Sequence, residues 1–174
     1  MFNMEDPMPV DANDFKACLG RFGSGVTVVT IAGDEDHGMT ASAFCSLSLD
    51  PPLVLVCVKN GNTTHGKLLE SKGFAINILA ADQKDLSNRF GGWGFPEDQD
   101  KWADLNITRG EASGAPLLDG AMAHLDCTLY GTREGGDHTI FIGHVETATA
   151  FGERDELEPL VYFAGAYRGV GKTL

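Results

Sequence analysis

Alternating polar and apolar positions set one stretch of the chain apart, from Gly38 to Pro52. Its hydroxyl residues are Thr40, Ser42, Ser46 and Ser48. A period of two gives a strand one polar and one apolar face. Pro51 and Pro52 cannot donate to a strand ladder, so they end the pairing. The pattern predicts a strand along which a flat aromatic ligand can approach the backbone. The alternative is a hydroxyl-rich edge strand that faces water.

Further runs of apolar and β-branched residues predict the remaining strands. They span residues 26–32, 53–58, 73–79, 121–130, 138–150, 160–163 and 166–168. The segment 53–58 is nearly all apolar, so we expect it to be buried on both faces. Residues 134–137 read as the turn of a long hairpin. Six or more strands with only short helices between them favour a mainly β, closed antiparallel barrel.

The N-terminal helix is predicted from an amphipathic stripe. Residues 1–10 contain two prolines and two acids and read as a flexible leader, after which Asp11 can cap a helix. The apolar positions of this helix are Phe15, Cys18, Leu19 and Phe22. This spacing places them on one face, which we expect to pack into the core. Residues 11–174 are expected to form a single domain.

Two more helices and a long loop complete the predicted elements. Asn62 can cap one helix, in which Leu68 and Leu69 face inward, and Asp82 can cap another. Residues 91–114 break the pattern with glycines, a proline, acids and two tryptophans. We expect a long surface loop there, acting as a lid or a dimer arm.

The charge balance restricts the classes of partner. The formal net charge of −12 argues against nucleic acid or an anionic membrane as a partner. It does not exclude a phosphate ligand, because a distant field is screened over about 8 Å while local donors act directly. The four cysteines contain no Cys-x-x-Cys pair, which favours reduced thiols and a cytoplasmic location. The five histidines show no metal-ligand spacing, and we expect no metal site.

The N-terminus lacks a basic segment followed by an apolar run, so no signal peptide is expected. No segment approaches the ~20 apolar residues that a membrane-spanning helix requires. There is no Gly-x-Gly-x-x-Gly after an early strand, so no Rossmann domain is expected to bind a nicotinamide cofactor.

Seven segments, taken in order, carry a family resemblance. They are Gly20-Arg21-Phe22, Gly25–Thr30, Gly38–Pro52, Leu53–Val58, Thr64-His65, Phe74–Leu79 and Gly136-Asp137-His138. Together they resemble the short-chain flavin reductases, the reductase components of two-component flavin monooxygenases. The resemblance implies an antiparallel split β-barrel (the FMN-binding split barrel) with short flanking helices. It also implies a homodimer, because the family places its flavin groove near a subunit interface.

The activity that the resemblance implies is reduction of FMN or FAD by NADH or NADPH. The reduced flavin would go to a separate oxygenase, or its electrons to another acceptor. In that family the hydroxyl-rich segment lies along the flavin. Carried over by position, Thr40, Ala41 and Ser42 would border the isoalloxazine ring. Ser46, Leu47 and Ser48 would approach the ribityl–phosphate end.

A second group of candidate residues lies at the start of the predicted helix that follows the strand 53–58. These residues are Lys59, Asn62, Thr63 and Thr64. A helix N-terminus presents N–H groups and partial positive charge, which suits a phosphate. The family commonly has serine where this chain has Asn62. The alternative is an ordinary capped helix.

The third group is Asp137 and His138 of the Gly-Asp-His triplet, backed by Tyr167 and Arg168. The resemblance implies that the triplet borders the place where nicotinamide stacks on flavin. His138 is then the catalytic candidate, as a group that positions the nicotinamide rather than a proton donor. Without the family, His138 reads as a solvated turn residue and Arg168 as a surface arginine.

Two rival functions remain open at this point. One is a flavin carrier or sensor on the same barrel, without reductase turnover. The other is an oxidase of the related pyridoxamine-phosphate type. The Gly-Asp-His triplet and the segment 40–48 favour the reductase over both.

Overall fold

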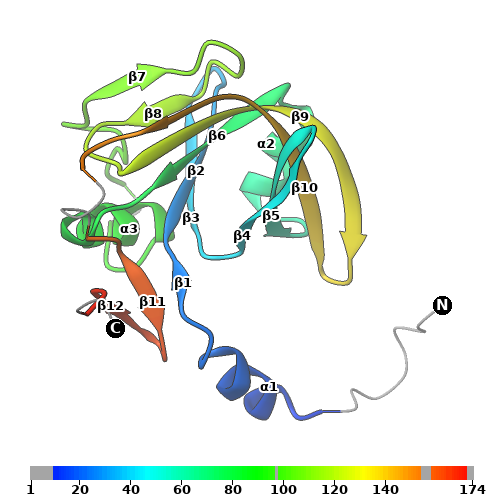
Figure 1. The fold of residues 1–174 in the computed structure, drawn as a ribbon, viewed down its shortest axis with the longest axis vertical. Coiled ribbons are helices and arrows are strands. Elements are labelled where there is room, and N and C mark those ends of the chain that lie inside the picture. Colours follow the sequence, from blue (N-terminus) through cyan, green and yellow to red (C-terminus); the bar gives the residue numbers. More distant parts are fainter. Residues whose placement is uncertain (1–9, 97, 154–157, 172–174) are drawn as a thin grey trace.

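The computed structural model describes residues 10–96, 98–153 and 158–171, and the main body is a seven-stranded antiparallel sheet (Figure 1). The first nine residues of the predicted leader lie outside the described residues. In sheet order the strands are β3 (His37–Ala41), β2 (Thr27–Ile31), β6 (Gly73–Ile78), β9 (Ala123–Gly135), β10 (His138–Ala150), β5 (Pro52–Lys59) and β4 (Phe44–Leu49). The sheet curls strongly (Figure 1). The predicted mainly β, antiparallel split-barrel fold with short flanking helices is confirmed, but the closed barrel is not: β3 and β4 remain as the two edges of the described sheet.

The centre of this sheet is built by the β-branched and aromatic residues of its middle strands. All five residues of β2 are buried, and Phe74 and Phe141 are fully buried beside them. β9 and β10 form a long hairpin whose turn includes Gly136 at φ +69°. That backbone conformation favours glycine. The β9 register also brings His124 opposite Asn77 of β6.

The hydroxyl-rich stretch is not one strand, which corrects the prediction. β3 and β4 lie at opposite edges of the sheet, and the chain passes between them through Ser42 and Ala43. The Ala41 carbonyl accepts the Thr27 hydroxyl of β2, whereas the Ala43 carbonyl accepts the Cys57 N–H of β5. The chain therefore changes partner within two residues. Alternation alone cannot reveal this, because the pattern encodes which face is polar and not which strand is the neighbour.

The segment 91–114 is packed more firmly than a surface loop. It contains β7 (Ile107–Arg109), which pairs with β8 (Pro116–Leu118). The Trp102 ring packs edge-on against Phe90 at a centroid distance of 4.9 Å, within a second buried cluster. A third, small sheet joins β1 (Ser24–Gly25), β11 (Val161–Phe163) and β12 (Ala166–Arg168). The predicted surface loop is therefore only partly right: most described residues of the segment are half-buried or exposed, but it contains the strand β7.

The helices flank the sheet, as predicted, but their faces differ from expectation. α1 (Ala12–Leu19) is capped by Asp11, yet it contains no buried residue. The expected core stripe is instead exposed, with Phe22 at 79%. The amphipathic pattern correctly indicates a helix with an apolar face, but it does not show what covers that face.

The other two helices do contact the sheet. α2 (Thr63–Glu70) is capped by Asn62 and buries Leu68, whereas Leu69 is half exposed, contrary to expectation. α3 (Lys84–Gly91) buries Phe90. It follows a 3-10 turn at Ala81–Gln83, so Asp82 is not its cap. In place of an Asp cap, the Gln83 side chain accepts the Ala80 N–H at 3.0 Å.

Candidate active site

A groove of about 720 Å³ opens between β4, β5, α1 and the β11–β12 turn. Its lining residues are Lys16, Leu19, Gly20, Phe22, Ser24, Ser42, Ala43, Phe44, Cys45, Leu55, Cys57, Tyr162, Ala164 and Gly165. We call this the apolar groove. Leu55 and Cys57 are only half-buried because they face it, so β5 is not buried on both faces as predicted. Among the described lining residues, Lys16 carries the only charge.

Of the predicted flavin-contacting residues, Ser42 lines the apolar groove, whereas the side chains of Thr40 and Ala41 do not. The Thr40 hydroxyl donates to the Ser87 carbonyl of α3 at 2.6 Å. Ala41 is 7% exposed and belongs to the main core. The side chains of Thr40 and Ala41 therefore hold the fold together, while Ser42 reaches the groove.

Ser46, Leu47 and Ser48 run away from the predicted phosphate site rather than toward it. Ser46 pairs with Val54, five residues before Lys59 on β5. Five residues of strand span about 17 Å. Ser42 and Ala43 lie nearer to Lys59, because Ala43 bonds to Cys57. Within one chain, Ser42 and Ala43 are therefore the part of this segment nearest to Lys59.

The N-terminus of α2 presents a different set of side chains from the one predicted. The Asn62 side chain accepts the His65 N–H at 2.7 Å, so its oxygen is engaged as a cap. Thr64 is buried and its hydroxyl bonds His37 Nε2 at 2.7 Å. Lys59 and Thr63 are exposed. Of the four candidates, these two side chains are directed to solvent and suited to an anion.

His37 lies behind this helix, and burial lowers its pKa below the ordinary value for histidine. The positive charges of Lys67 and Lys101 lower this pKa further. A neutral imidazole can then exchange one hydrogen bond with the buried Thr64 hydroxyl. His37 and Thr64 therefore anchor α2 to the sheet, and Thr64 does not face the anion site.

The structure brings His138 to the same place as Lys59. The two residues pair directly across β10 and β5, and the Asn60 N–H donates to the Asp137 carbonyl at 2.9 Å. His138 Nδ1 lies 2.7 Å from the Asp137 carboxylate. This hydrogen bond, with the charge of His138, lowers the pKa of Asp137. Because an ionised carboxylate only accepts, Nδ1 is the donor, and Nε2 is the ring nitrogen left to contact a ligand.

Tyr167 and Arg168 do not lie behind this triplet within one chain. They belong to β12, and Figure 1 places β12 at the opposite end of the molecule from the β9–β10 turn. The Tyr167 hydroxyl lies 2.8 Å from Ser87 Oγ and 3.2 Å from Asn88 Oδ1 of α3. Arg168 is exposed. The predicted grouping is wrong for a single chain.

Sequence reasoning missed most of the groove wall. Lys16, Tyr162 and Ala164 come from segments far apart in the chain and meet only in the folded structure. No local pattern marks them as neighbours of Ser42. Cys45 and Leu47 alternate with Phe44 in the sequence, but this pattern alone does not show which face of the strand is covered.

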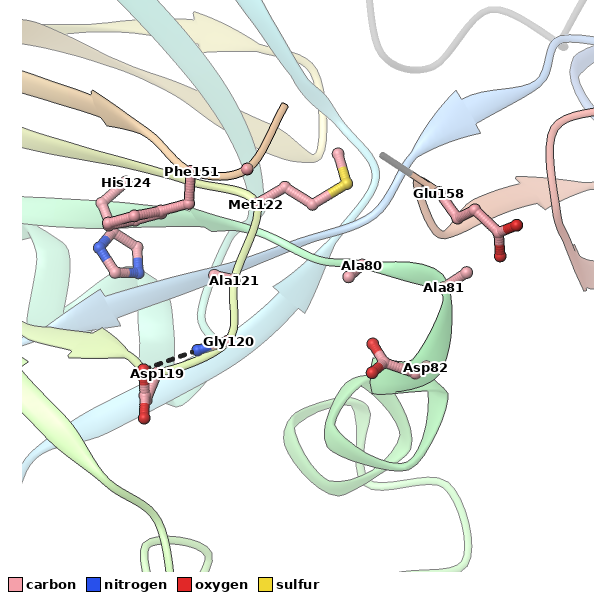
Figure 2. Close-up of a pocket in the computed structure, with 11 residues that line it drawn as sticks. Ala80, Ala81, Asp82, Asp119, Gly120, Ala121, Met122, His124, Phe151 and Glu158 are labelled. Carbon is pink, nitrogen blue, oxygen red and sulfur yellow. Dashed lines mark hydrogen bonds between the residues drawn. The ribbon is translucent and has the colours of Figure 1, made fainter. Parts of the chain in front are cut away.

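A second pocket, of about 530 Å³, contains none of the predicted site residues. Figure 2 shows Asp82, Asp119 and Glu158 around it, with the His124 ring against Phe151. Across the described part of the chain, no three His, Cys, Asp or Glu side chains gather as metal ligands do. None of its described lining residues belongs to the apolar groove.

Comparison with known proteins decides the family. Residues 19–171 match the model of the flavin reductase like domain. The chain belongs to this family. Among curated proteins, the flavin reductase-like chain is 42% identical over 160 residues to an NADH-dependent FAD reductase from Streptomyces globisporus, covering 92% of this chain and 86% of that protein. It is 41% identical over 159 residues to an NADH-dependent flavin reductase from a Rhodococcus species, covering 89% and 84%.

Solved structures agree with this assignment. The flavin reductase component BorF of a bacterial two-component tryptophan halogenase superposes with a TM-score of 0.84 at 40% identity, covering 94% of this chain and 100% of that one. The predicted class, a flavin-reducing oxidoreductase, is confirmed. In the residues that the structure describes, no helix is long and apolar enough to cross a membrane.

The residues of this flavin reductase-like chain fit a flavin. The volume of the apolar groove is in the usual range for ligand pockets, and its walls are largely apolar and aromatic, as a flat ring system requires. Along β5, Cys57 of the groove is two residues from Lys59, where the α2 N-terminus and His138 meet. Two strand residues span about 7 Å, so a ring site and an anion site adjoin.

Proposed function

We propose that this protein transfers a hydride from NADH to FAD and releases the reduced flavin to a separate oxygenase component. The observation that carries the proposal is the meeting of three features along β5. The apolar groove ends at Cys57, the exposed Lys59 follows, and His138 pairs with Lys59. The names of the relatives from Streptomyces and Rhodococcus support NADH as the donor, and the former supports FAD.

Each part of the site has a role in this reaction. The bound flavin supplies the two-electron acceptor, and the protein supplies binding and orientation. The apolar groove covers one face of a flat ring and excludes water there. Thr63, Lys59 and the N–H groups of α2 hold a phosphate. His138, oriented by Asp137, contacts the nicotinamide through Nε2, so its role is positioning.

We also propose that the protein is a homodimer. α1, the turn that follows it and β4 expose a set of large apolar side chains in one chain. They are Phe15, Leu19, Phe22, Leu47 and Leu49, with Leu49 at 95%. Large exposed apolar patches mark interaction sites. A second copy of the chain would cover these residues and close the open side of the groove.

Sedimentation velocity tests the dimer. We expect twice the chain mass at micromolar concentration, and a shift toward monomer for Leu49→Asp, in which a charge replaces the most exposed side chain. Glu146→Gln, on the exposed outer end of β10, is the matched surface control. A stable wild-type monomer at that concentration would remove the proposal.

The activity test is multiple turnover. We expect NADH oxidation with a catalytic amount of protein and excess FAD, at least as fast as with FMN. No NADH loss beyond one equivalent per chain would instead favour the flavin carrier. Oxygen consumption with pyridoxamine phosphate and no NADH would favour the rival oxidase. The cytoplasmic location stays a prediction.

A further inference from the structure

The hairpin tip that carries Asp137 and His138 lies where the pairing of the sheet ends. β9 pairs with β6 only as far as Thr128, so beyond it β10 is its only ladder partner among the described strands. The ladder between β10 and β5 in turn ends at His138, opposite Lys59. Gly136 and Asp137 lie beyond this last ladder pair, in the turn between β9 and β10. Contacts outside the ladder therefore fix the position of these turn residues beside His138.

Asn60 makes those contacts. Its backbone N–H donates to the Asp137 carbonyl at 2.9 Å, and its side-chain amide donates to the Gly136 carbonyl at 3.3 Å. Its side-chain oxygen accepts the Thr139 hydroxyl at 2.8 Å. One side chain and its backbone thus bond to residues on both sides of His138.

The Thr139 hydroxyl connects this clamp to α2. Thr139 Oγ1 lies 3.0 Å from His65 Nε2. Because the Thr139 proton goes to Asn60, the oxygen accepts and His65 Nε2 donates. The His65 ring stands edge-on to Phe141 at a centroid distance of 5.7 Å, and its backbone N–H donates to the Asn62 cap. Hydrogen bonds therefore run from the α2 cap to the hairpin tip.

We propose that Asn60 and Thr139 are positioning residues that hold the His138 tip at one place relative to the α2 N-terminus. This inference rests on the proposed function, which assigns the flavin phosphate to that helix end and the nicotinamide to His138. Hydride transfer needs donor and acceptor atoms about 3–3.5 Å apart, and a misplacement of about 1 Å can cost on the order of a hundredfold in rate. A short hydrogen-bonded path between the two subsites keeps that separation constant.

The test uses one hydroxyl and a matched control. Thr139→Val removes the hydroxyl and keeps the β-branched shape, whereas Thr139→Ser keeps the hydroxyl. Thr128→Val is the control, because it removes a hydroxyl of the same hairpin that bonds Glu146 at 2.7 Å, away from the tip. In stopped-flow reduction of FAD by NADH, we expect Thr139→Val to be slower by on the order of tenfold, with Thr139→Ser and Thr128→Val within about twofold of wild type.

A second readout does not depend on activity. Hydrogen–deuterium exchange of the ligand-free protein should show faster exchange at residues 133–138 in Thr139→Val and Asn60→Ala, and no change there in Thr128→Val. The dissociation constant of FAD, from fluorescence titration, should stay near the wild-type value in Thr139→Val.

The outcomes separate this inference from the proposed function. Unchanged exchange at the tip in Thr139→Val, or a rate loss that Thr139→Ser shares, would overturn the positioning role. A wild-type protein that does not oxidise NADH with FAD would overturn the proposed function instead. In that case the exchange measurement still decides whether Asn60 and Thr139 hold the tip.

Discussion

Arg109 and Asp36 form a two-pronged ion pair, with guanidinium nitrogens 2.8 and 2.7 Å from the two carboxylate oxygens. The pair joins β7 to the turn before β3, and the hydrogen bond to Asp36 raises the pKa of Arg109. The Trp102 indole N–H donates to the Asp36 carbonyl at 3.1 Å. Asp36 therefore fixes the 91–114 segment from both its side chain and its backbone.

The first prediction concerns this segment. Arg109 is half exposed, so Arg109→Ala should lower the free energy of unfolding by no more than about 1 kcal/mol. Trp102 is half-buried and packs against the second buried cluster, so Trp102→Ala should cost about 2 kcal/mol, less than loss of a fully buried tryptophan. Urea titration of both variants measures the difference. Equal small losses would mean that the segment is a loosely held lid after all.

The second prediction uses two glycines of the β9–β10 hairpin. A Cβ on Gly143 would lie 2.6 Å from the Phe74 ring and 2.9 Å from Cys127 Cβ, whereas one on Gly131 would meet nothing within 4 Å. Gly143→Ala should therefore lower the free energy of unfolding by about 1–3 kcal/mol, through overpacking. Gly131→Ala should be neutral or slightly stabilising, because glycine is unfavourable inside a strand. Thermal unfolding of the two variants gives the comparison, and equal melting temperatures would contradict it.

The third prediction is a pH dependence of stability from His37. Its pKa is lower in the folded protein than the unfolded value of about 6.5, so the unfolded chain binds the proton more readily. The stability from this residue is fully present above pH about 6.5 and is lost as pH falls toward the folded pKa. Urea midpoints across this range should fall more steeply in wild type than in His37→Gln. The acids with lowered pKa, Asp137 and Glu146, are common to both proteins and cancel in the difference.

The fourth prediction separates two adjacent threonines. Thr63 is exposed at the α2 N-terminus, so Thr63→Ala should weaken FMN binding by about 1.5–3 kcal/mol, the range for a hydrogen bond to a charged group. Riboflavin, which lacks the phosphate, should bind both proteins equally. Thr64→Ala should instead reduce thermal stability, because its hydroxyl bonds the buried side of His37. Fluorescence titrations with both flavins measure this, and a matched loss for riboflavin would place the phosphate elsewhere.

The fifth prediction concerns His138 itself. His138→Ala should slow hydride transfer by on the order of a hundredfold, because positioning of the nicotinamide is lost. Flavin affinity should change little. Stopped-flow reduction over a pH series distinguishes a proton donor, for which the wild-type rate falls as pH rises through the imidazole pKa. An unchanged rate at every pH and NADH concentration would make His138 an ordinary turn residue.

Much of the local structure follows from the sequence alone. The strand at residues 138–150, the strands expected within 26–32 and 73–79, and the caps at Asp11 and Asn62 are all confirmed. Their causes are local: side-chain period, β-branching, and a polar atom within three residues of an unpaired N–H. The family could also be recognised from the sequence, because short motifs in a fixed order remain recognisable when the overall identity is moderate.

Only the tertiary structure decided how these elements meet. The step from β3 to β4 at Ser42 places one polar stretch at two edges of the sheet, and the half-buried side of β5 becomes a groove wall. Asn60 bonds across 79 residues to Thr139, and Thr64 turns inward to His37. Alternation and capping depend on neighbours along the chain, whereas these contacts depend on which strand lies beside which. That choice is made by the packing of the whole sheet around Phe74 and Phe141, and a local pattern does not contain it.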